Sequence, residues 1–275
     1  MRIQESMQRR SRQLLVLSLA ITMVVSLFPI GGVADHLPVP TSAAVAGSLQ
    51  SELGCASDWD PACLDTELSN LIGDAWKSTF AVPAGDWEYK VALNDTWDVS
   101  YPSANVALAL GAATDVSIYY SHLTHWVADS KNDRIVTAPG SFQSELGCTG
   151  DWDPGCLASW LQDPDGDDVY TFVTDAIPAG SYEGKAAISE SWDENYGEGG
   201  VANGANIAFT VADGDTVTFA FDSPTNTLTV DSSPAEPPAG PTAAVVGSFQ
   251  EELGCPGDWQ PECAETELVN VIGDV

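Results

Sequence analysis

The chain has 275 residues, with 40 acidic and nine basic side chains and a formal charge of −31 at pH 7. Residues 1–34 hold four of the nine basic residues and one acid, which leaves 39 acids against five bases in the remainder. The negative electrostatic potential of such a chain repels nucleic acid and anionic lipid, so we exclude both as partners. Neutral, cationic or sugar-like ligands remain open. A solvated surface suited to a salty or acidic medium explains the charge itself.

The first segment has the pattern of a secretory signal. Arg9, Arg10 and Arg12 precede an apolar run over residues 14–30, and the small residues 32–34 offer a cleavage site. The run is long enough for an uncleaved anchor, but polar residues and Pro29 interrupt it. We therefore expect a signal peptide over residues 1–34, an extracellular protein, and no membrane contact after cleavage.

One stretch with two cysteines, a tryptophan and several acids occurs three times, as GSLQSELGCASDWDPAC (47–63), GSFQSELGCTGDWDPGC (140–156) and GSFQEELGCPGDWQPEC (247–263). The similarity extends further, since AVPAGDWEYKVALNDTWD (81–98) matches AIPAGSYEGKAAISESWD (176–193). A period of about 95 residues is that of a small domain rather than of a solenoid repeat.

The repeats divide the chain into modules and linkers. Pro-, Ala- and Ser-rich sequence predicts an extended spacer over residues 232–244, and residues 129–140 are expected to play the same part between the first two copies. A third copy of about thirty residues is too short to bury a core. We therefore expect the amino-terminal part of a longer protein with a further domain downstream. The expected boundaries are a signal peptide (1–34), a linker (35–45), module 1 (46–130), a linker (131–139), module 2 (140–231), a Pro-rich linker (232–246) and the start of module 3 (247–275).

Module 2 shows mostly period-two alternation of apolar and polar residues, which is typical of strands. Turn residues at 212–215 and 223–226 separate some of these runs. The spacing predicts an all-β fold, namely tandem immunoglobulin-like β-sandwich domains after the signal peptide. Residues 64–76 predict at most one or two helical turns. The expected strands are 169–174, 181–188, 206–211, 216–221 and 227–230.

The cysteines are expected to form three local disulfides, because the repeat makes pairing within each copy the simplest of the fifteen arrangements. A zinc site would need four ligands, and no histidine lies in any copy of the motif. Each loop then presents one tryptophan, either as a core plug or as an exposed platform. The expected pairs are Cys55–Cys63, Cys148–Cys156 and Cys255–Cys263, around Trp59, Trp152 and Trp259.

Flat apolar faces and planar hydrogen-bonding side chains are what sugar binding requires. A lysine at the same place in both modules supports such a site, although a surface ion pair would also explain it. Tandem copies suit multivalent binding of weak ligands. The candidates in module 1 are Trp59, Trp87, Lys90, Trp97 and Asn105, and those in module 2 are Trp152, Lys185, Trp192, Tyr196 and Asn206.

Other motifs carry little chemistry. Asp163, Asp165 and Asp167 alternate over a glycine turn, but no Glu follows at the EF-hand position, so we expect a plain β-turn with calcium as the alternative and no other cofactor. His122 and His125 are expected in a solvated hairpin turn. No nucleophile, zinc-protease or phosphate-loop motif occurs, so we expect no catalytic residue.

The long segment that starts GSFQSELGCTGDWDPGC closely resembles the accessory module found in tandem ahead of the catalytic barrel of bacterial pullulanases and related α-amylases. The resemblance covers residues 140–230, and residues 46–128 and the opening of the third copy more loosely. PAGSYEGKAAISESWDENYG (178–197) also resembles the starch- and glycogen-binding modules of isoamylase-like enzymes, which implies an immunoglobulin-like β-sandwich.

The resemblance to glycogen-binding modules also implies glucan-contacting residues: a Lys after the Pro-Ala-Gly turn, a Trp on the next strand and a later Asn. Module 1 lacks the ENYGEGG loop (194–200), so its site is expected to be impaired. We predict a secreted, non-catalytic region that binds α-glucan (starch, pullulan or glycogen) and is linked to a glycoside hydrolase of the pullulanase or α-amylase type. The alternative is a structural spacer or adhesion array without sugar binding. The implied positions are Lys90, Trp97 and Asn105 in module 1 and Lys185, Trp192 and Asn206 in module 2.

Overall fold

The structure, a computed structural model, describes residues 39–235, 243–259 and 267–268. The predicted signal peptide and Cys263 lie outside these residues. Within the described ranges the regular structure is strand apart from short 3-10 turns, and no helix there is long and apolar enough to cross a membrane. The all-β prediction is confirmed. The 3-10 turns are η1 (Ser51–Leu53), η2 (Leu64–Thr66), η3 (Leu157–Ser159), η4 (Glu198–Gly200) and η5 (Glu251–Leu253).

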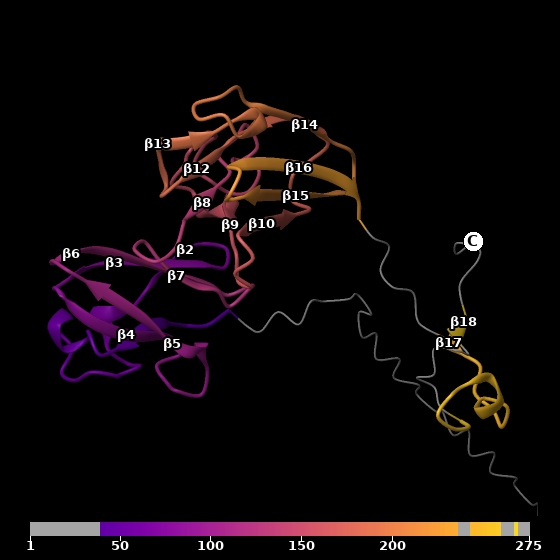
Figure 1. The fold of residues 1–275 in the computed structure, drawn as a ribbon, viewed down its shortest axis with the longest axis horizontal. Coiled ribbons are helices and arrows are strands. Elements are labelled where there is room, and N and C mark those ends of the chain that lie inside the picture. The colour runs from indigo at the N-terminus through magenta and orange to yellow at the C-terminus, as the bar shows by residue number, and fades with distance from the viewer. Residues whose placement is uncertain (1–38, 236–242, 260–266, 269–275) are drawn as a thin grey trace, which may run out of the picture. The chain divides into compact units, whose positions relative to one another are not determined.

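Module 1 is a sandwich of two antiparallel sheets (Figure 1). One sheet has the order β1-β4-β5, with β1 (Ala43–Gly47), β4 (Gly85–Leu93) and β5 (Ser100–Leu110). The other has the order β2-β3-β6-β7, with β2 (Ser69–Ile72), β3 (Ala75–Val82), β6 (Thr114–Ser121) and β7 (Val127–Asp129). Inward side chains of both sheets, including Tyr89, Leu108 and Ile118, form one core together with Leu49 of the turn after β1. Outward residues of β4 and β5 are left to face solvent.

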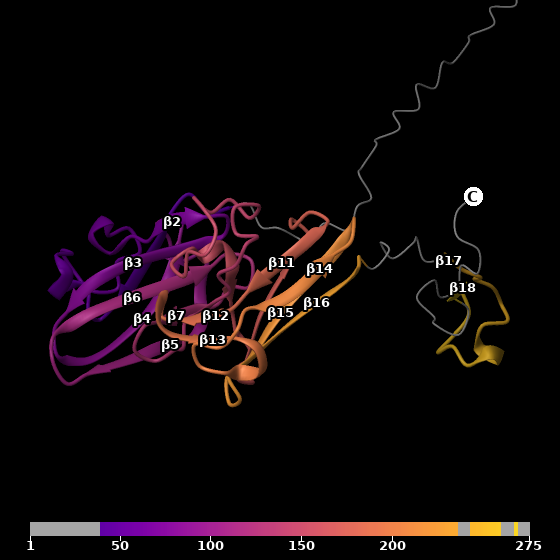
Figure 2. The same ribbon diagram turned by 90° about the horizontal axis from the view of Figure 1, so that it is seen from above.

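Module 2 repeats this plan with shorter strands. Figures 1 and 2 show β14, β15 and β16 running side by side. The sheets have the orders β13-β12-β8-β9, β11-β14 and β10-β15-β16. The strands are β8 (Val136–Thr137), β9 (Trp160–Leu161), β10 (Val169–Thr174), β11 (Gly180–Gly184), β12 (Ala186–Ile188), β13 (Ser191–Tyr196), β14 (Ile207–Val211), β15 (Asp215–Asp222) and β16 (Thr227–Pro234).

The core of module 2 is aromatic. Alternation along β15 buries Val217, Phe219 and Phe221 completely, as the period-two pattern predicted. Phe142, the apolar residue of the repeated GSFQ sequence, lies between the sheets with its ring centroid 5.0 Å from that of Phe219. Burying such a ring contributes about 1.5–3 kcal/mol, so this position anchors the repeated motif on the sandwich.

The stretch between the first two repeats is packed rather than extended as a spacer. Residues 135–140 are buried, and β8 pairs with β9 and β12 of module 2. An apolar cluster here draws on both modules, because it joins Ala75 and Tyr119 to Leu157 and Trp160. The Trp160 ring centroid is 5.3 Å from that of Trp126 and 5.7 Å from that of Tyr119. The first two modules therefore share a hydrophobic contact.

Polar contacts accompany this cluster. Lys77 of module 1 forms an ion pair with Glu190 of module 2. Arg134 donates hydrogen bonds to Glu194 Oε1 at 2.6 Å and to Asn226 Oδ1 at 2.8 Å, and its guanidinium lies over the Phe221 ring at 5.1 Å. The ion pair joins the two modules, and the Arg134 contacts bind the connecting stretch to module 2.

Two acids in this stretch interact inside the protein. Asp129 is fully buried and accepts a hydrogen bond from the Tyr89 hydroxyl at 2.9 Å. The Asp129 backbone N–H donates to Asp133 Oδ2 at 2.8 Å. Burial, followed by the negative charges of Asp129 and Asp163, raises the pKa of Asp133 above its usual 3.8.

Several local expectations need correction. Strand β1 begins at Ala43, inside the segment expected to be a linker, and β16 runs to Pro234, past the expected end of module 2 at residue 231. Residues 64–76 form one 3-10 turn followed by β2 and the start of β3, because Leu68, Ala75 and Trp76 are needed in a core. The third copy has described elements β17 (Ala243–Ala244), η5 and β18 (Glu267–Leu268).

Candidate functional site

The repeated motif is organised around a buried glutamine that the sequence analysis did not single out. In module 2, Gln143 Oε1 accepts the Asp153 N–H at 2.8 Å and the Gly140 N–H at 3.4 Å. Its Nε2 donates to the Asp153 carbonyl at 2.9 Å and to Ser159 Oγ at 3.0 Å. All four hydrogen-bonding positions of this amide are therefore used inside the loop.

The same glutamine recurs in the other copies. Gln50 Oε1 accepts the Asp60 N–H at 2.8 Å, and its Nε2 donates to the Asp60 carbonyl at 2.8 Å. In the third copy the Gly247 N–H donates to Gln250 Oε1 at 3.3 Å. All three glutamines are completely buried. The conserved spacing within the motif thus serves the loop's hydrogen bonds as well as its disulfide.

The disulfides close these loops. Cys55–Cys63 and Cys148–Cys156 are bonded, with Cα atoms 5.9 and 6.0 Å apart, which confirms these two predicted pairs. Cys255 is buried, and its predicted partner lies outside the described residues. By loop-closure entropy each bridge contributes roughly 2.5 kcal/mol.

The acids of the motif have a structural role besides solvation. Asp151 Oδ1 accepts the Ser144 N–H at 2.9 Å, and Asp58 does the same for Ser51 at 2.8 Å. Asp153 Oδ1 accepts the Gly155 N–H at 2.9 Å. These carboxylates bind backbone donors of the loop and leave the tryptophan between them at one fixed place.

The loop tryptophan has the left-handed backbone conformation in all three copies, with φ of 57°, 62° and 60° at Trp59, Trp152 and Trp259. Bulky residues rarely adopt this conformation, which costs about 1–3 kcal/mol and marks a constrained position. The Trp152 N–H donates to the Gly140 carbonyl at 3.2 Å, as its counterparts do to the equivalent glycines. Trp59 and Trp152 are half-buried and Trp259 is 67% exposed, so they are not core plugs.

The outward face of the β4–β5 pair carries several module 1 candidates. Glu88 and Lys90 point to the same face because they are two residues apart on one strand. Asn105 Nδ2 donates to Glu88 Oε2 at 3.1 Å, and Lys90 Nζ donates to the Ser103 carbonyl at 2.7 Å. The lysine is therefore held by a backbone oxygen rather than by an acid, which argues against the surface-pair interpretation.

Two indoles meet beside this face. The ring centroids of Trp59 and Trp97 are 6.4 Å apart, with an angle of 38° between the planes. Trp59 comes from the disulfide loop and Trp97 from the turn between β4 and β5, so loops far apart in the sequence build the pair. Trp97 is 44% exposed. Two adjoining rings at the surface offer an apolar platform.

Module 2 places the equivalent polar residues in the same way. Asn206 Nδ2 donates to Glu183 Oε2 at 2.9 Å, which repeats the Asn105–Glu88 contact. Lys185 Nζ donates to Asn195 Oδ1 at 3.3 Å, and Asn195 Nδ2 donates to the Trp192 carbonyl at 2.9 Å. Trp192 is 39% exposed. Lys185 and Trp192 are thus joined through one buried asparagine.

Two of the predicted site residues pack partly against a module core. Tyr196 pairs across the strands with the buried Ala186 and packs against Phe221, so it faces the core side of the sheet. Trp87 is half-buried against the module 1 core, and its Nε1 donates to the Pro83 carbonyl at 3.1 Å. Neither offers a free platform like Trp97.

Sequence reasoning missed Glu88, Glu183 and the buried glutamines. Each occupies the same place in the repeated text, Glu88 in DWEYK and Glu183 in SYEGK. Their identity across the repeats was the available signal. Acids are so abundant in this chain that one repeated glutamate did not stand out.

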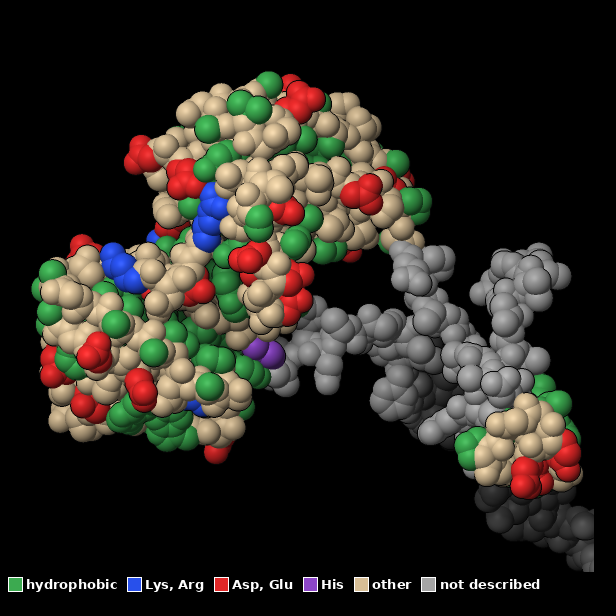
Figure 3. Space-filling model, viewed as in Figure 1, with side chains coloured by type: hydrophobic (Ala, Val, Ile, Leu, Met, Phe, Trp, Pro, Cys, Tyr) green, Lys and Arg blue, Asp and Glu red, His purple; other side chains and the backbone are tan. Residues whose placement is uncertain are grey.

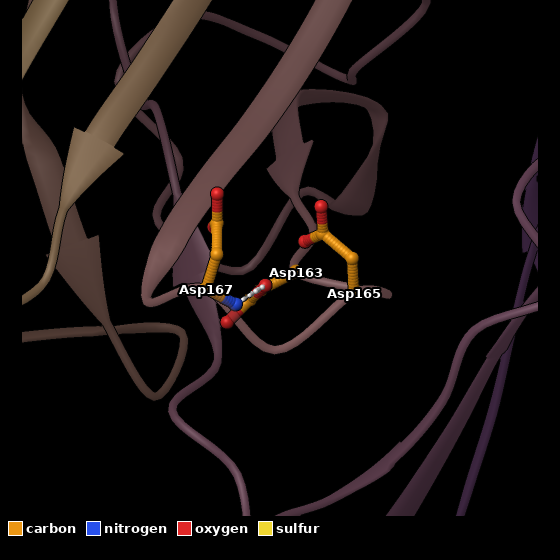
Figure 4. Close-up of side chains that lie close together, drawn as sticks. All are labelled: Asp163, Asp165 and Asp167. Atoms are coloured by element: carbon orange, nitrogen blue, oxygen red, sulfur yellow. Dashed lines mark hydrogen bonds between the residues drawn. The ribbon is translucent and has the colours of Figure 1, made fainter.

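The three aspartates proposed as an alternative calcium site do lie together (Figure 4). One oxygen from each of Asp163, Asp165 and Asp167 lies within 4.8 Å of the others. Asp163 is buried, and its carboxylate accepts N–H groups of Gly166, Asp167 and Asp168 at 2.9–3.1 Å. These bonds account for the turn, whereas calcium needs six to eight oxygens, so calcium binding stays a prediction.

The expected solvated turn at His122 and His125 is wrong for His122, which is buried. The Tyr120 hydroxyl lies 3.1 Å from Nδ1 of both histidines, and the His125 ring stacks on Tyr101 at 4.1 Å. Burial, followed by the nearby His122, lowers the pKa of His125 from 6.5. The turn is folded back because the His122 N–H donates to the Asp74 carbonyl at 2.9 Å.

Acidic side chains are scattered over the face seen in Figure 3, and basic ones are few there. Fold and surface together define tandem β-sandwich modules that each hold a loop tryptophan near the glutamate of a Glu–Asn pair, with a lysine two residues after that glutamate. The sequence profile of the pullulanase X25 domain matches residues 42–127, 135–228 and 242–275. The chain belongs to the pullulanase X25 domain family, which confirms the resemblance to pullulanase-associated modules. The first two matched ranges start next to β1 and β8.

Curated relatives agree with this family. The chain is 34% identical over 218 residues to an amylopullulanase of Thermoanaerobacter thermohydrosulfuricus, which covers 76% of this chain and 14% of the relative. It is 32% identical over 230 residues to an amylopullulanase of Thermoanaerobacterium thermosulfurigenes, and the match covers 79% of this chain and 12% of the relative. The chain thus spans less than a fifth of the length of these relatives.

Two solved structures are similar in part. A pullulanase from Bacillus acidopullulyticus matches with a TM-score of 0.32 and 16% identity, over 70% of this chain and 29% of that one. SusF from Bacteroides thetaiotaomicron matches with a TM-score of 0.24 and 12% identity, over 86% of this chain and 56% of SusF.

Proposed function

We propose that this chain is a secreted, non-catalytic region that binds α-glucan for a glycoside hydrolase of the pullulanase or α-amylase type. The observation that carries the proposal is the Trp59–Trp97 pair, in which Trp97 is 44% exposed, on the module that also presents Lys90 and the Glu88–Asn105 pair. Module 2 repeats the lysine and the Glu–Asn pair. The names of the relatives support a starch-related substrate.

The chemistry fits a neutral polysaccharide. Indole faces stack on the C–H surfaces of glucose, while lysine and asparagine donate to ring hydroxyls. One or two rings and a few polar partners give weak binding, which tandem sites strengthen through effective concentration. Extracellular location is supported by the two disulfides, because these persist in oxidising compartments.

Module 1 was expected to be the impaired copy, but its geometry favours the opposite interpretation. The shorter connection after Trp97 leaves this indole in contact with Trp59. We therefore propose that module 1 is a competent glucan site. Starch, pullulan and glycogen share the α-1,4-linked glucose that such a platform would contact.

Affinity electrophoresis of the whole chain in amylopectin and pullulan gels tests the function. We expect retarded mobility, with Trp97→Ala and Trp192→Ala each relieving part of it. Val173→Ala, at a 54% exposed position on β10, is the matched control and should migrate like the unchanged chain. Unretarded mobility in every gel would leave the structural spacer as the better interpretation.

A further inference from the structure

A groove occurs at the same place in both modules, next to the loop tryptophan. Each groove has a serine of the GS(L/F)Q sequence, the loop tryptophan, and an aromatic residue and a glutamate on the adjoining strand. In module 1 these are Ser48, Trp59, Trp87 and Glu88, and in module 2 they are Ser141, Trp152, Tyr182 and Glu183. The recurrence at equivalent positions shows that the fold builds this groove from the repeated motif.

The groove walls are fixed by hydrogen bonds. In module 2 the Glu183 N–H donates to Ser141 Oγ at 3.0 Å, and the Ser141 N–H donates to the Glu183 carbonyl at 2.9 Å. In module 1 the Glu88 N–H donates to Ser48 Oγ at 3.0 Å, and the Ser48 N–H donates to the Glu88 carbonyl at 2.9 Å. The loop is thereby fastened to the strand that carries the glutamate.

The glutamate side chain connects the groove to the polar surface described above. Glu183 accepts one hydrogen bond from Asn206, and a carboxylate has about four acceptor positions on its two oxygens. Glu183 and Glu88 are both exposed, so hydroxyl groups of a ligand can reach them. An aromatic wall beside a carboxylate is suited to a sugar ring with adjacent hydroxyls.

Charge favours a neutral ligand here. The carboxylate repels anions, and Asp86 adds a second negative charge to the module 1 groove. A cation is disfavoured by Lys90, two residues beyond Glu88 on the same face of β4, and by Lys185, two residues beyond Glu183 in the chain. A polyhydroxylated neutral ring is compatible with both charges, because it can donate to the carboxylate and accept from the ammonium group.

We propose that each groove is a further glucose-binding position in which Glu88 and Glu183 accept sugar hydroxyls. It continues from the exposed Trp–Lys–Asn surface of its module, which is formed by Trp97, Lys90 and Asn105 in module 1 and by Trp192, Lys185 and Asn206 in module 2. This inference rests on the proposed function and deepens it, because it makes the affinity of each module depend on the length of the glucan chain. A disaccharide occupies only the Trp–Lys–Asn surface. Longer oligosaccharides extend into the groove and gain affinity.

Titration calorimetry of the whole chain with maltose, maltotetraose and maltoheptaose tests the inference. We expect affinity to rise with oligosaccharide length in the unchanged chain. Ala107 and Ala208 line the two grooves at exposed strand positions, so Ala107→Ile with Ala208→Ile fills both without removing a polar group. This variant should lose about tenfold in affinity for maltoheptaose and keep its affinity for maltose.

A second variant addresses the carboxylates. Glu88→Gln with Glu183→Gln keeps an acceptor for the asparagines and removes the charge, so it should also lower maltoheptaose affinity by about tenfold, the effect of one charge-assisted hydrogen bond. Thr79→Ile with Val173→Ile, at exposed positions of the opposite sheets, is the control. Denaturation midpoints confirm that each variant is folded.

The outcomes separate the two proposals. If the groove variants bind maltoheptaose as tightly as the control, the groove inference is wrong and the proposed function stands. If no oligosaccharide binds the unchanged chain, the proposed function fails and the inference fails with it.

Discussion

Gln143 binds both backbone polar groups of Asp153: its Oε1 accepts the N–H at 2.8 Å, and its Nε2 donates to the carbonyl at 2.9 Å. The pair closes the loop that carries Trp152, and Gln50 does the same with Asp60 in module 1. A buried polar side chain in the repeated motif therefore determines where the loop tryptophan lies.

Gln143→Leu should destabilise module 2 by about 3–5 kcal/mol, because it leaves several buried backbone groups without a partner. Chemical denaturation followed by circular dichroism measures this loss. The exposed neighbour Glu145 offers a control, since Glu145→Ala should change the free energy of unfolding by no more than about 0.5 kcal/mol. A cost below about 1 kcal/mol for Gln143→Leu would show that the disulfide alone defines the loop.

Trp160 couples the two modules. It is 1% exposed and packs against Tyr119 and Trp126, and its Nε1 lacks a hydrogen-bond partner within the described residues. Trp160→Ala should cost about 3–5 kcal/mol and separate the unfolding of the modules into two transitions. Trp160→Phe should cost less than about 1.5 kcal/mol, because it keeps a ring and removes the unpaired donor.

Differential scanning calorimetry measures these transitions. The control is Trp97→Ala, which removes an exposed indole in module 1 and should leave the junction unchanged. If Trp160→Ala still unfolds in a single transition at the temperature of the unchanged chain, the apolar cluster does not join the modules.

Asp133 should make stability depend on pH. Its pKa is raised in the folded state, so the folded protein binds this proton more tightly than the unfolded chain does. The contribution of protonated Asp133 to the free energy of unfolding is therefore fully present below the ordinary pKa of 3.8. It is lost as the pH rises through the raised pKa of the folded state. Asp133→Asn keeps an acceptor for the Asp129 N–H and removes the charge.

Urea denaturation at a series of pH values tests this directly. The free energy of unfolding of Asp133→Asn should exceed that of the unchanged chain at neutral pH, and the difference should shrink toward pH 3.8. Comparing the two proteins at each pH isolates the effect of the Asp133 charge, including its repulsion by Asp129 and Asp163. A difference that grows as the pH falls would contradict the assignment.

Much of the fold could be predicted from alternation alone. Strand β10 has the predicted bounds, and β14, β15 and β16 lie within a few residues of theirs, because each has one buried and one exposed face. The strands β8 and β9 were missed because a strand of two residues is too short to show an alternation of apolar and polar side chains. Val136 and Leu161 of these strands are buried at the junction between the modules. Contacts between modules override the local pattern there.

The site was predicted in part for a similar reason. Lysine, exposed tryptophan and asparagine could be selected by residue type and by repetition. The core-side position of Tyr196 could not be predicted, because a strand sequence does not show which face a residue takes after the bulge at Ala187/Ile188. The contact between Trp59 and Trp97 joins two loops, so no spacing within one motif could indicate it.

The central claim is that equivalent faces of modules 1 and 2 bind α-glucan through their exposed tryptophans. Titration of the whole chain with maltoheptaose, compared with Trp97→Ala, Trp192→Ala and the double variant, measures it most directly. Each single variant should remove one class of binding site, and the double variant should remove both. Binding by the double variant with the affinity and number of sites of the unchanged chain would contradict the account.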